Sequence, residues 1–129
     1  MIPFPWQLTT STESRNLDEK TINEFGIPGY TLMEIAGYAM ATDLINTLKH
    51  DQHVLVFCGK GNNGGDGLVI ARYLSEHFHK VSVLFVSGTD GLSPDAKKNY
   101  GLLKKLKQHH DQEQAITFIE GWKPEALTS

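Results

Sequence analysis

Short apolar runs alternate with longer helical patterns through the second half of the chain. The apolar runs predict β-strands over about 53–58, 80–87 and 115–119. The segments between them carry apolar residues at helical spacing and predict helices over about 68–79 and 93–108. Strands that alternate with helices are typical of a parallel sheet with right-handed crossovers. We therefore expect an α/β fold, a Rossmann-like three-layer αβα arrangement that is incomplete, because only about three strands are present.

The N-terminal part of the chain predicts two further helices. Thr10-x-x-Glu13 and Thr31-x-x-Glu34 both match the capping box, in which a threonine hydroxyl and a glutamate carboxylate accept from each other's backbone N–H groups. The segment 26–29, rich in glycine and proline, separates the two helices. The second helix is expected to bury the apolar residues on one side, Leu32, Ile35, Ala36, Ala39, Met40 and Leu44. Its small residues suggest close packing against another element.

Composition and charge are those of an ordinary globular domain. The chain has 129 residues, of which 40% are hydrophobic and 21% charged, so it is long enough to bury a core. Its net charge of −3 argues against a general nucleic-acid or anionic-membrane binder. The lysines of the predicted helix 93–108 are interpreted as its solvated face. The six histidines lie at predicted element ends or on polar faces and form no recognisable metal-ligand or base cluster.

The single cysteine and the N-terminal residues indicate in which cellular compartment we expect the protein. Cys58 alone cannot form an internal disulfide, which is compatible with the cytoplasm. Because it closes an apolar run, we interpret it as a buried, inert thiol. Residues 1–6 lack a basic segment and contain two prolines, so they are not typical of a signal peptide. No apolar run approaches the roughly 20 residues of a membrane span.

The most specific signal is the stretch 59–67, Gly-Lys-Gly-Asn-Asn-Gly-Gly-Asp-Gly, which lies between a predicted strand and a predicted helix. A strand, a glycine-rich turn and a helix N-terminus together present backbone N–H groups to an anion. The glycines allow positive φ angles and the close approach of a ligand to the main chain. The two asparagines add amide donors and acceptors. This stretch predicts a loop that binds phosphate.

Three kinds of glycine-rich turn compete as interpretations of this stretch. A P-loop needs Lys and then Ser or Thr after its last glycine, whereas Leu68 follows Gly67. The dinucleotide fingerprint G-x-G-x-x-G is matched over 59–64, but it expects an acid at the end of the next strand, and the first acid there is Asp90. A tight turn that binds nothing does not need the polar sequence Asn-Asn-Gly-Gly-Asp.

Taken whole, the stretch 59–67 and the helix after it resemble the signature of the YjeF N-terminal domain family, which contains the NAD(P)H-hydrate epimerases. Residues 32–37 are similar to the family's Met-Glu-x-Ala-Gly segment. The region around Arg15, Leu17 and Gly26 resembles its paired N-terminal helices. The resemblance covers roughly residues 10–119. It implies one domain, 1–129, that corresponds to the N-terminal half to two-thirds of the family's domain.

The resemblance implies an isomerase that interconverts the R and S forms of hydrated NADH or NADPH, so that a partner dehydratase, dependent on ATP or ADP, can restore the cofactor. It implies that the substrate is contacted by Asn62, Asn63, Gly64, Gly65 and Asp66. It also implies that Asn63 ligates a potassium ion through its side-chain oxygen. An equal interpretation of Asp66 is that it stiffens the loop by accepting backbone N–H bonds. The family's catalytic carboxylate is expected beyond Ser129, so we expect weak or absent epimerase activity from this chain.

Other functions stay open at the level of sequence. The chain is also compatible with a non-catalytic nucleotide-binding or scaffold module, as in relatives that serve RNA-decapping assemblies. It is equally compatible with a fragment of a bifunctional epimerase and dehydratase. An oxidoreductase fragment is disfavoured by the missing acid after the second strand. We expect no nucleic-acid or membrane partner, and an exposed sheet edge would favour a homodimer.

Overall fold

The computed structural model describes residues 10–109 and 115–121. The chain forms two compact units, Met1–Leu32 and Met33–Ser129. The elements are α1 Ser11–Asn23, α2 Gly29–Thr47, β1 His53–Cys58, α3 Asn62–Ser75, β2 Lys80–Phe85, α4 Pro94–His109 and β3 Ile116–Glu120. Within the described ranges, no helix has the length and apolar character needed to cross a bilayer.

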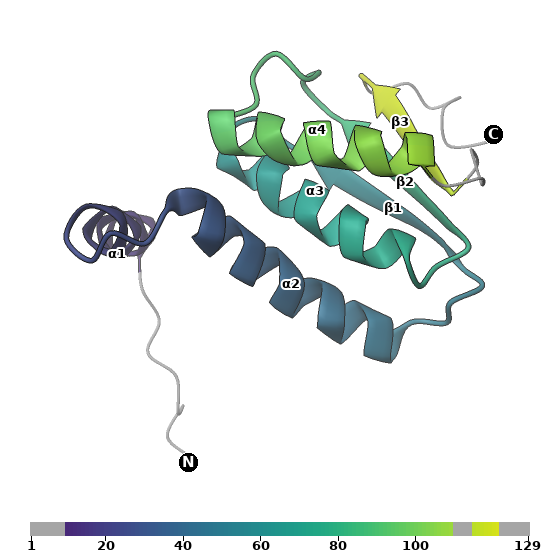
Figure 1. Ribbon diagram of the computed structural model, residues 1–129, viewed down its shortest axis with the longest axis horizontal. Coiled ribbons are helices and arrows are strands. Elements are labelled where there is room, and N and C mark those ends of the chain that lie inside the picture. Colours follow the sequence, from purple (N-terminus) through teal and green to yellow (C-terminus); the bar gives the residue numbers. More distant parts are fainter. Residues whose placement is uncertain (1–9, 110–114, 122–129) are drawn as a thin grey trace. The chain divides into compact units, whose positions relative to one another are not determined.

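The three strands form one parallel sheet in the order β1-β2-β3 (Figure 1). His53 lies opposite Lys80 in the first pair of strands, and Val81 lies opposite Ile116 in the second. The crossover helices α3 and α4 pack side by side on one face of this sheet. Right-handed crossovers place their helices on the same face of a sheet when each new strand is added at the same edge. The predicted α/β class, with a parallel sheet and two N-terminal helices, is confirmed.

The core lies between this face of the sheet and the helices α3 and α4. The core-facing residues of the central strand β2 are fully buried, namely Val81, Val83 and Phe85. The rings of Phe85 and Tyr100 meet edge to face with centroids 5.0 Å apart, which joins β2 to α4. Tyr100 also meets Phe118 of β3 at 5.2 Å. The sheet is thereby fixed to α4 by aromatic contacts, which favour such geometry.

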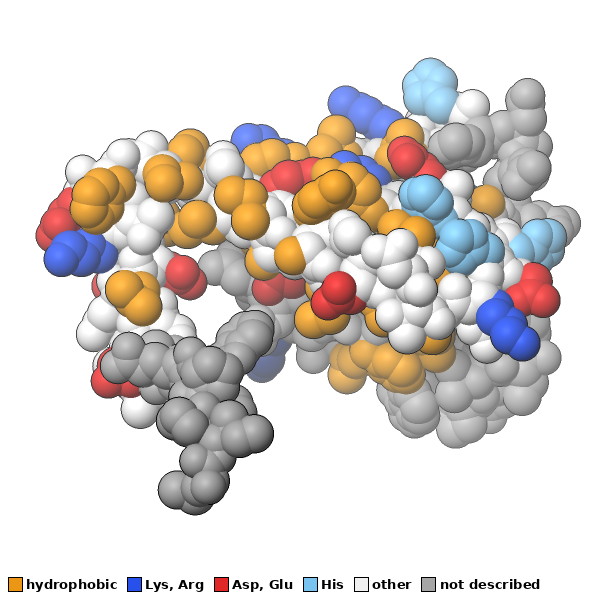
Figure 2. Space-filling model, turned by 90° about the horizontal axis from the view of Figure 1, so that it is seen from below, with side chains coloured by type: hydrophobic (Ala, Val, Ile, Leu, Met, Phe, Trp, Pro, Cys, Tyr) orange, Lys and Arg blue, Asp and Glu red, His pale blue; other side chains and the backbone are white. Residues whose placement is uncertain are grey.

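Helix α2 buries a different side from the predicted one. Its buried residues are Met33, Gly37 and Ala41. Ile35 and Met40, which were expected in the core, are 59% and 54% exposed, and hydrophobic side chains are visible on the surface in Figure 2. Gly37 decides the orientation, because an added Cβ there would lie 2.5 Å from Cβ of Val69. The apolar pattern could not choose a side, since α2 is apolar nearly all round.

The two predicted capping boxes had different outcomes. At α1 the capping box is present, with Glu13 N–H donating to Thr10 Oγ1 over 3.2 Å and Thr10 N–H donating to Glu13 Oε2 over 2.6 Å. The second prediction was wrong, because α2 begins at Gly29 and Thr31 lies inside its first turn. The N–H of Thr31 donates instead to the carbonyl of Pro28. The carboxylate of Glu34 is therefore available for contacts with α3.

Candidate functional site

The candidate site is the junction between the end of β1 and the start of α3. β1 ends at Cys58, and α3 begins at Asn62, so only residues 59–61 form a loop. Gly61 caps the helix with a φ of +71°, a conformation that glycine adopts without strain. Its N–H donates to the carbonyl of Gly91 over 2.9 Å. The rest of the predicted glycine loop is helical, and Gly61 is the only one of its glycines with a positive φ.

The later glycines of the stretch allow close packing, which the sequence interpretation had assigned to ligand approach. An added Cβ on Gly64 would lie 2.6 Å from Leu92 Cδ2, and one on Gly67 would lie 2.7 Å from Cys58 Sγ. An added Cβ on Gly65 would lie 2.5 Å from Cε of Met33. Glycine is therefore needed at these positions because α3 lies directly against β1, α2 and the start of α4. This packing holds the first turn of α3 in place.

The polar residues of the first turn face outward from this packed base. The side chains of Asn62 and Asn63 are exposed, and Asp66 is half-buried one turn further along. Gly64 and Gly65 are buried, so they can offer a ligand only backbone atoms. Among the described residues, the N–H groups of Asn62 and Asn63 have no acceptor, and no side chain caps the helix. These groups and the helix dipole favour an anion at this point.

The five residues expected to contact substrate are thus brought together in the first turns of α3, but with different accessibility. Only the asparagines present their side chains openly to solvent. Their role in binding stays a prediction. Cys58, directly beneath the helix, is fully buried, and burial raises its thiol pKa to about 12. Its interpretation as a buried thiol is confirmed, and burial disfavours the thiolate that a nucleophile would need.

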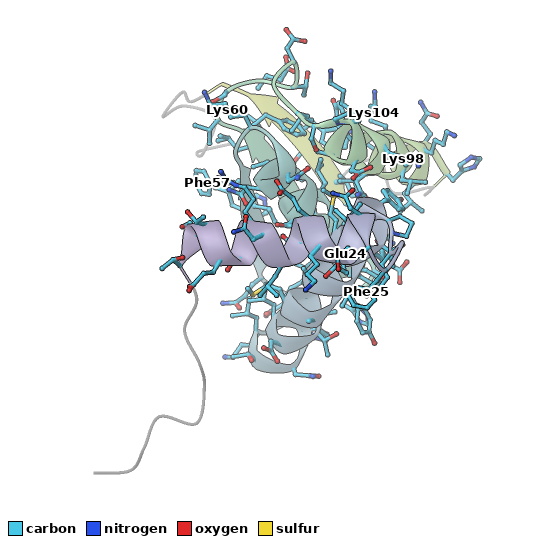
Figure 3. All side chains as sticks on the ribbon, turned by 90° about the vertical axis from the view of Figure 1, so that its left-hand side faces the viewer. Glu24, Phe25, Phe57, Lys60, Lys98 and Lys104 are labelled. Carbon is cyan, nitrogen blue, oxygen red and sulfur yellow. The ribbon has the colours of Figure 1, made fainter. Side chains whose placement is uncertain are left out.

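A second group of residues at the same edge of the sheet was not found from the sequence. The loop between β2 and α4 reaches the junction through Gly91, and the last residue of β3, Glu120, reaches the same loop. Thr89 Oγ1 donates to Glu120 Oε1 over 3.0 Å. The carboxyl ends of three parallel strands thus supply neighbouring groups to one edge, where α/β proteins bind ligands. Lys60, labelled in Figure 3, belongs to the loop 59–61 between β1 and α3.

An ion pair holds α2 against the last turn of α3. Glu34 accepts hydrogen bonds from Arg72 Nη2 and from the Tyr73 hydroxyl, the latter over 2.5 Å. Partial burial would raise the pKa of Glu34, but the hydrogen bonds from Arg72 and Tyr73 outweigh it and lower the pKa below its ordinary value. Met33, next to Glu34, lies under Gly65. The ion pair and Met33 therefore hold α3 against α2 near its last and first turns, respectively.

The described residues contain no group of three or more His, Cys, Asp or Glu side chains that could hold a metal ion. The rings of His50 and His77 lie with centroids 5.9 Å apart, far from the α3 N-terminus in sequence and at the other end of that helix. His110 lies outside the described residues. Any cation at the candidate site would have to be held by the amide oxygens of the asparagines and by Asp66.

Comparisons with known proteins show which family the chain resembles. The family described as "YjeF-related protein N-terminus" matches residues 29–126. A bifunctional NAD(P)H-hydrate repair enzyme, Nnr, from Salinibacter ruber is 44% identical over 115 residues, which cover 87% of this chain and 21% of the relative. An NAD(P)H-hydrate epimerase from Lentilactobacillus buchneri is 40% identical over 120 residues, which cover 88% of this chain and 56% of the relative. The chain thus spans only part of the length of these relatives.

A solved structure supports the fold. The crystal structure of the yeast protein YNL200c superposes with a TM-score of 0.75 at 22% identity. The match covers 95% of this chain and 51% of the yeast chain. The arrangement of helices on a parallel sheet is therefore one found in a protein about twice as long.

Proposed function

Because the chain belongs to the family of YjeF-related proteins through their N-terminal domain, we propose that its β1–α3 junction binds the diphosphate of hydrated NADH or NADPH. The proposed activity is that of an NAD(P)H-hydrate epimerase, an isomerase that interconverts the R and S forms of the hydrated cofactor. The names of the relatives from Lentilactobacillus buchneri and Salinibacter ruber support this choice of substrate. The word bifunctional in the name of the Salinibacter ruber relative is consistent with a second repair activity. We propose that this activity, on a partner or a fused neighbour, is that of a dehydratase acting with ATP or ADP.

The observation that carries the proposal is the uncapped start of α3. The N–H groups of Asn62 and Asn63 have no acceptor among the described residues, and their side chains are exposed. A diphosphate can accept from such groups while its charge meets the positive end of the helix dipole. The buried packing of Gly64 and Gly65 keeps these donors fixed before the ligand arrives. Fixed donors reduce the entropy lost on binding.

We further propose that Asn63 ligates a potassium ion beside the phosphates. Asn63 and Asp66 are three positions apart on α3, a spacing that places side chains on one face of a helix. Neutral and carboxylate oxygens suit a hard monovalent cation, so the donors present fit potassium. When bound, the ion would neutralise charge near the diphosphate.

Epimerisation needs a proton donor and acceptor close to the nicotinamide ring. Among the described residues, Asp66 is the only acid on the first turns of α3, and this position suits it to positioning the substrate. The chain spans 56% of the length of its Lentilactobacillus relative. We therefore propose that its residues bind the substrate in the cytoplasm, that the catalytic carboxylate is not among them, and that the chain alone has weak or absent activity.

Calorimetric titration of the full chain with hydrated NADPH and with NADPH tests the proposal. We expect tighter binding of the hydrated compound, and tighter binding in potassium chloride than in sodium chloride. Asn63→Ala keeps the backbone N–H but removes the proposed potassium ligand, so it should weaken binding by about tenfold. Asn46→Ala, at an exposed asparagine of α2, is the matched control and should bind as the wild type does.

The other outcomes discriminate between functions. Preference for NADPH over its hydrated form would indicate an oxidoreductase fragment and would reject the repair function. Failure of both compounds to bind would indicate a scaffold module and would also reject it. A turnover assay on hydrated NADH that gives rates typical of a complete epimerase would overturn the expectation of weak activity.

A further inference from the structure

Glu120 is held at the carboxyl edge of the sheet by the backbone around it. It is the last residue of β3, and the next N–H, from Gly121, donates to the carbonyl of Phe85 over 3.0 Å. The N–H of Gly88 donates to the same carbonyl over 3.2 Å. Both glycines have positive φ angles, so each turns the chain sharply just beyond its strand. The end of β3 and the loop after β2 are therefore fixed side by side.

The carboxylate of Glu120 points across to the loop that follows β2. Its Oε1 accepts from Thr89 Oγ1 over 3.0 Å. Among the described residues, its second oxygen has no hydrogen-bond partner, and the side chain is exposed. One oxygen is therefore positioned by Thr89 while the other stays available to a ligand hydroxyl. A carboxylate oxygen can only accept, so the ligand group must be a donor.

The same loop connects Glu120 to the proposed diphosphate site. The N–H of Leu92 donates to the carbonyl of Thr89 over 3.3 Å, which makes a tight turn over residues 89–92. The next contact is from Gly61 N–H to the carbonyl of Gly91, over 2.9 Å. One short turn thus separates the group that positions Glu120 from the residue that caps α3.

In Rossmann-like folds an acid beside the phosphate loop accepts from the ribose 2′-hydroxyl, whereas an arginine accommodates a 2′-phosphate. No acid ends β2 in this chain, but Glu120, at the end of the neighbouring strand β3, contacts the loop that follows β2. The segments 59–61, 86–93 and 120–121 contain the acids Asp90 and Glu120, no arginine and one lysine, Lys60. Of these two acids, Glu120 is the one positioned by Thr89, and its carboxylate would repel a 2′-phosphate beside it.

We propose that Glu120, positioned by Thr89, binds the 2′-hydroxyl of the adenosine ribose and makes the site selective for the non-phosphorylated cofactor. This inference deepens the proposed function and rests on it for the location of the diphosphate. It assigns hydrated NADH, rather than hydrated NADPH, as the preferred substrate. It also assigns the loop 86–93 as the wall against which the adenosine lies.

The test uses the full chain and two probes that lack the nicotinamide ring, ADP-ribose and its 2′-phosphorylated form. Titration should show the wild type binding ADP-ribose at least about tenfold more tightly. Glu120→Gln should reduce this ratio to less than about threefold, because the repulsion of the phosphate is removed. Thr89→Val should also lower the ratio, since it frees the carboxylate. Asp90→Asn removes the same charge from the same loop and is the matched control, with the ratio unchanged.

The possible results separate the inference from the function on which it rests. Equal binding of the two probes by the wild type, or an unchanged ratio in Glu120→Gln, would overturn the inference. A ratio that moves equally in Asp90→Asn would also overturn it, because general charge would then explain selectivity. Selective binding of ADP-ribose without preference for hydrated over intact NADH would support the adenosine site and reject the repair function.

Discussion

The hydroxyl of Tyr73 donates to the carboxylate of Glu34 over 2.5 Å, and this bond joins the last turn of α3 to α2. Arg72 donates to the same carboxylate and lies over the Tyr73 ring, with its guanidinium carbon 4.7 Å from the centroid. The side chains of Arg72 and Glu34 are 18% and 31% exposed. The pair is therefore shielded enough from solvent to contribute to stability, unlike most surface ion pairs.

Replacing Glu34 by Gln should destabilise the fold. The amide keeps the size of the side chain but removes the charge that faces Arg72, so the expected loss is about 1–3 kcal/mol. Urea denaturation monitored by circular dichroism measures it. Asp43→Asn, at an exposed acid of the same helix, is the control and should stay within about 0.5 kcal/mol of the wild type. Equal stability of Glu34→Gln and the wild type would show that the pair contributes nothing.

Stability should fall in acid because of the same carboxylate. The pKa of Glu34 is lowered in the folded state from an ordinary value of 4.5, since its hydrogen bonds with Arg72 and Tyr73 exceed the cost of burial. The unfolded chain takes up the proton first, so the contribution is present above about pH 4.5 and is lost as the pH falls through the folded pKa. Between roughly pH 6 and pH 3, the free energy of unfolding should depend less steeply on pH in Glu34→Gln than in the wild type. Urea denaturation at each pH measures this dependence.

His53 should cause a second loss of stability on acidification, which begins at a higher pH than the loss due to Glu34. Its Nε2 and Ser82 Oγ lie 2.7 Å apart, and Ser82 in turn contacts Thr117 Oγ1 across the sheet. Burial and the nearby charge of Lys80 lower the pKa of His53 from 6.5. A neutral His53 is therefore favoured on folding, and stability should decline as the pH falls below about 6.5. The unfolding midpoint of His53→Gln should lack this decline, and an identical pH profile in both proteins would contradict the assignment.

Two glycine substitutions should have opposite effects. Gly65→Ala places a methyl group 2.5 Å from Met33 Cε and 3.1 Å from the Cα of Ala96, so overpacking should cost about 1–3 kcal/mol. Gly101→Ala has open space around the added atom in the interior of α4 and should stabilise by about 0.5–1 kcal/mol. Thermal unfolding of the two variants measures both. Destabilisation by both would show that backbone conformation, rather than packing, controls these sites.

Much of the fold could be predicted because its strands have no competing interpretation. The apolar run at 53–58 became β1 with the same bounds, and Ser93 caps α4 through its hydroxyl, which accepts from Ala96 N–H over 3.2 Å. Local sequence also settled the capping box of α1. These features depend on neighbours in the chain, which a sequence displays directly.

The features that were missed depend on contacts between distant parts of the chain. The buried side of α2 is set by the fit of Gly37 against Val69, and nothing within α2 distinguishes that side. The role of Gly64 and Gly65 in packing follows from Leu92 and Met33, which lie far from them in sequence. Glu120 escaped notice because a search along the chain after β2 does not reach an acid that arrives from β3.

Cys58 gives the strand–helix junction a built-in chemical reporter. The only thiol of the chain lies at full burial beneath Gly67, so an alkylating reagent can reach it only while α3 lifts away from β1. The rate of labelling in native buffer therefore measures how often this part of the protein opens. A dinucleotide held at the start of α3 would slow that rate by mass action, without any change in the unliganded molecule.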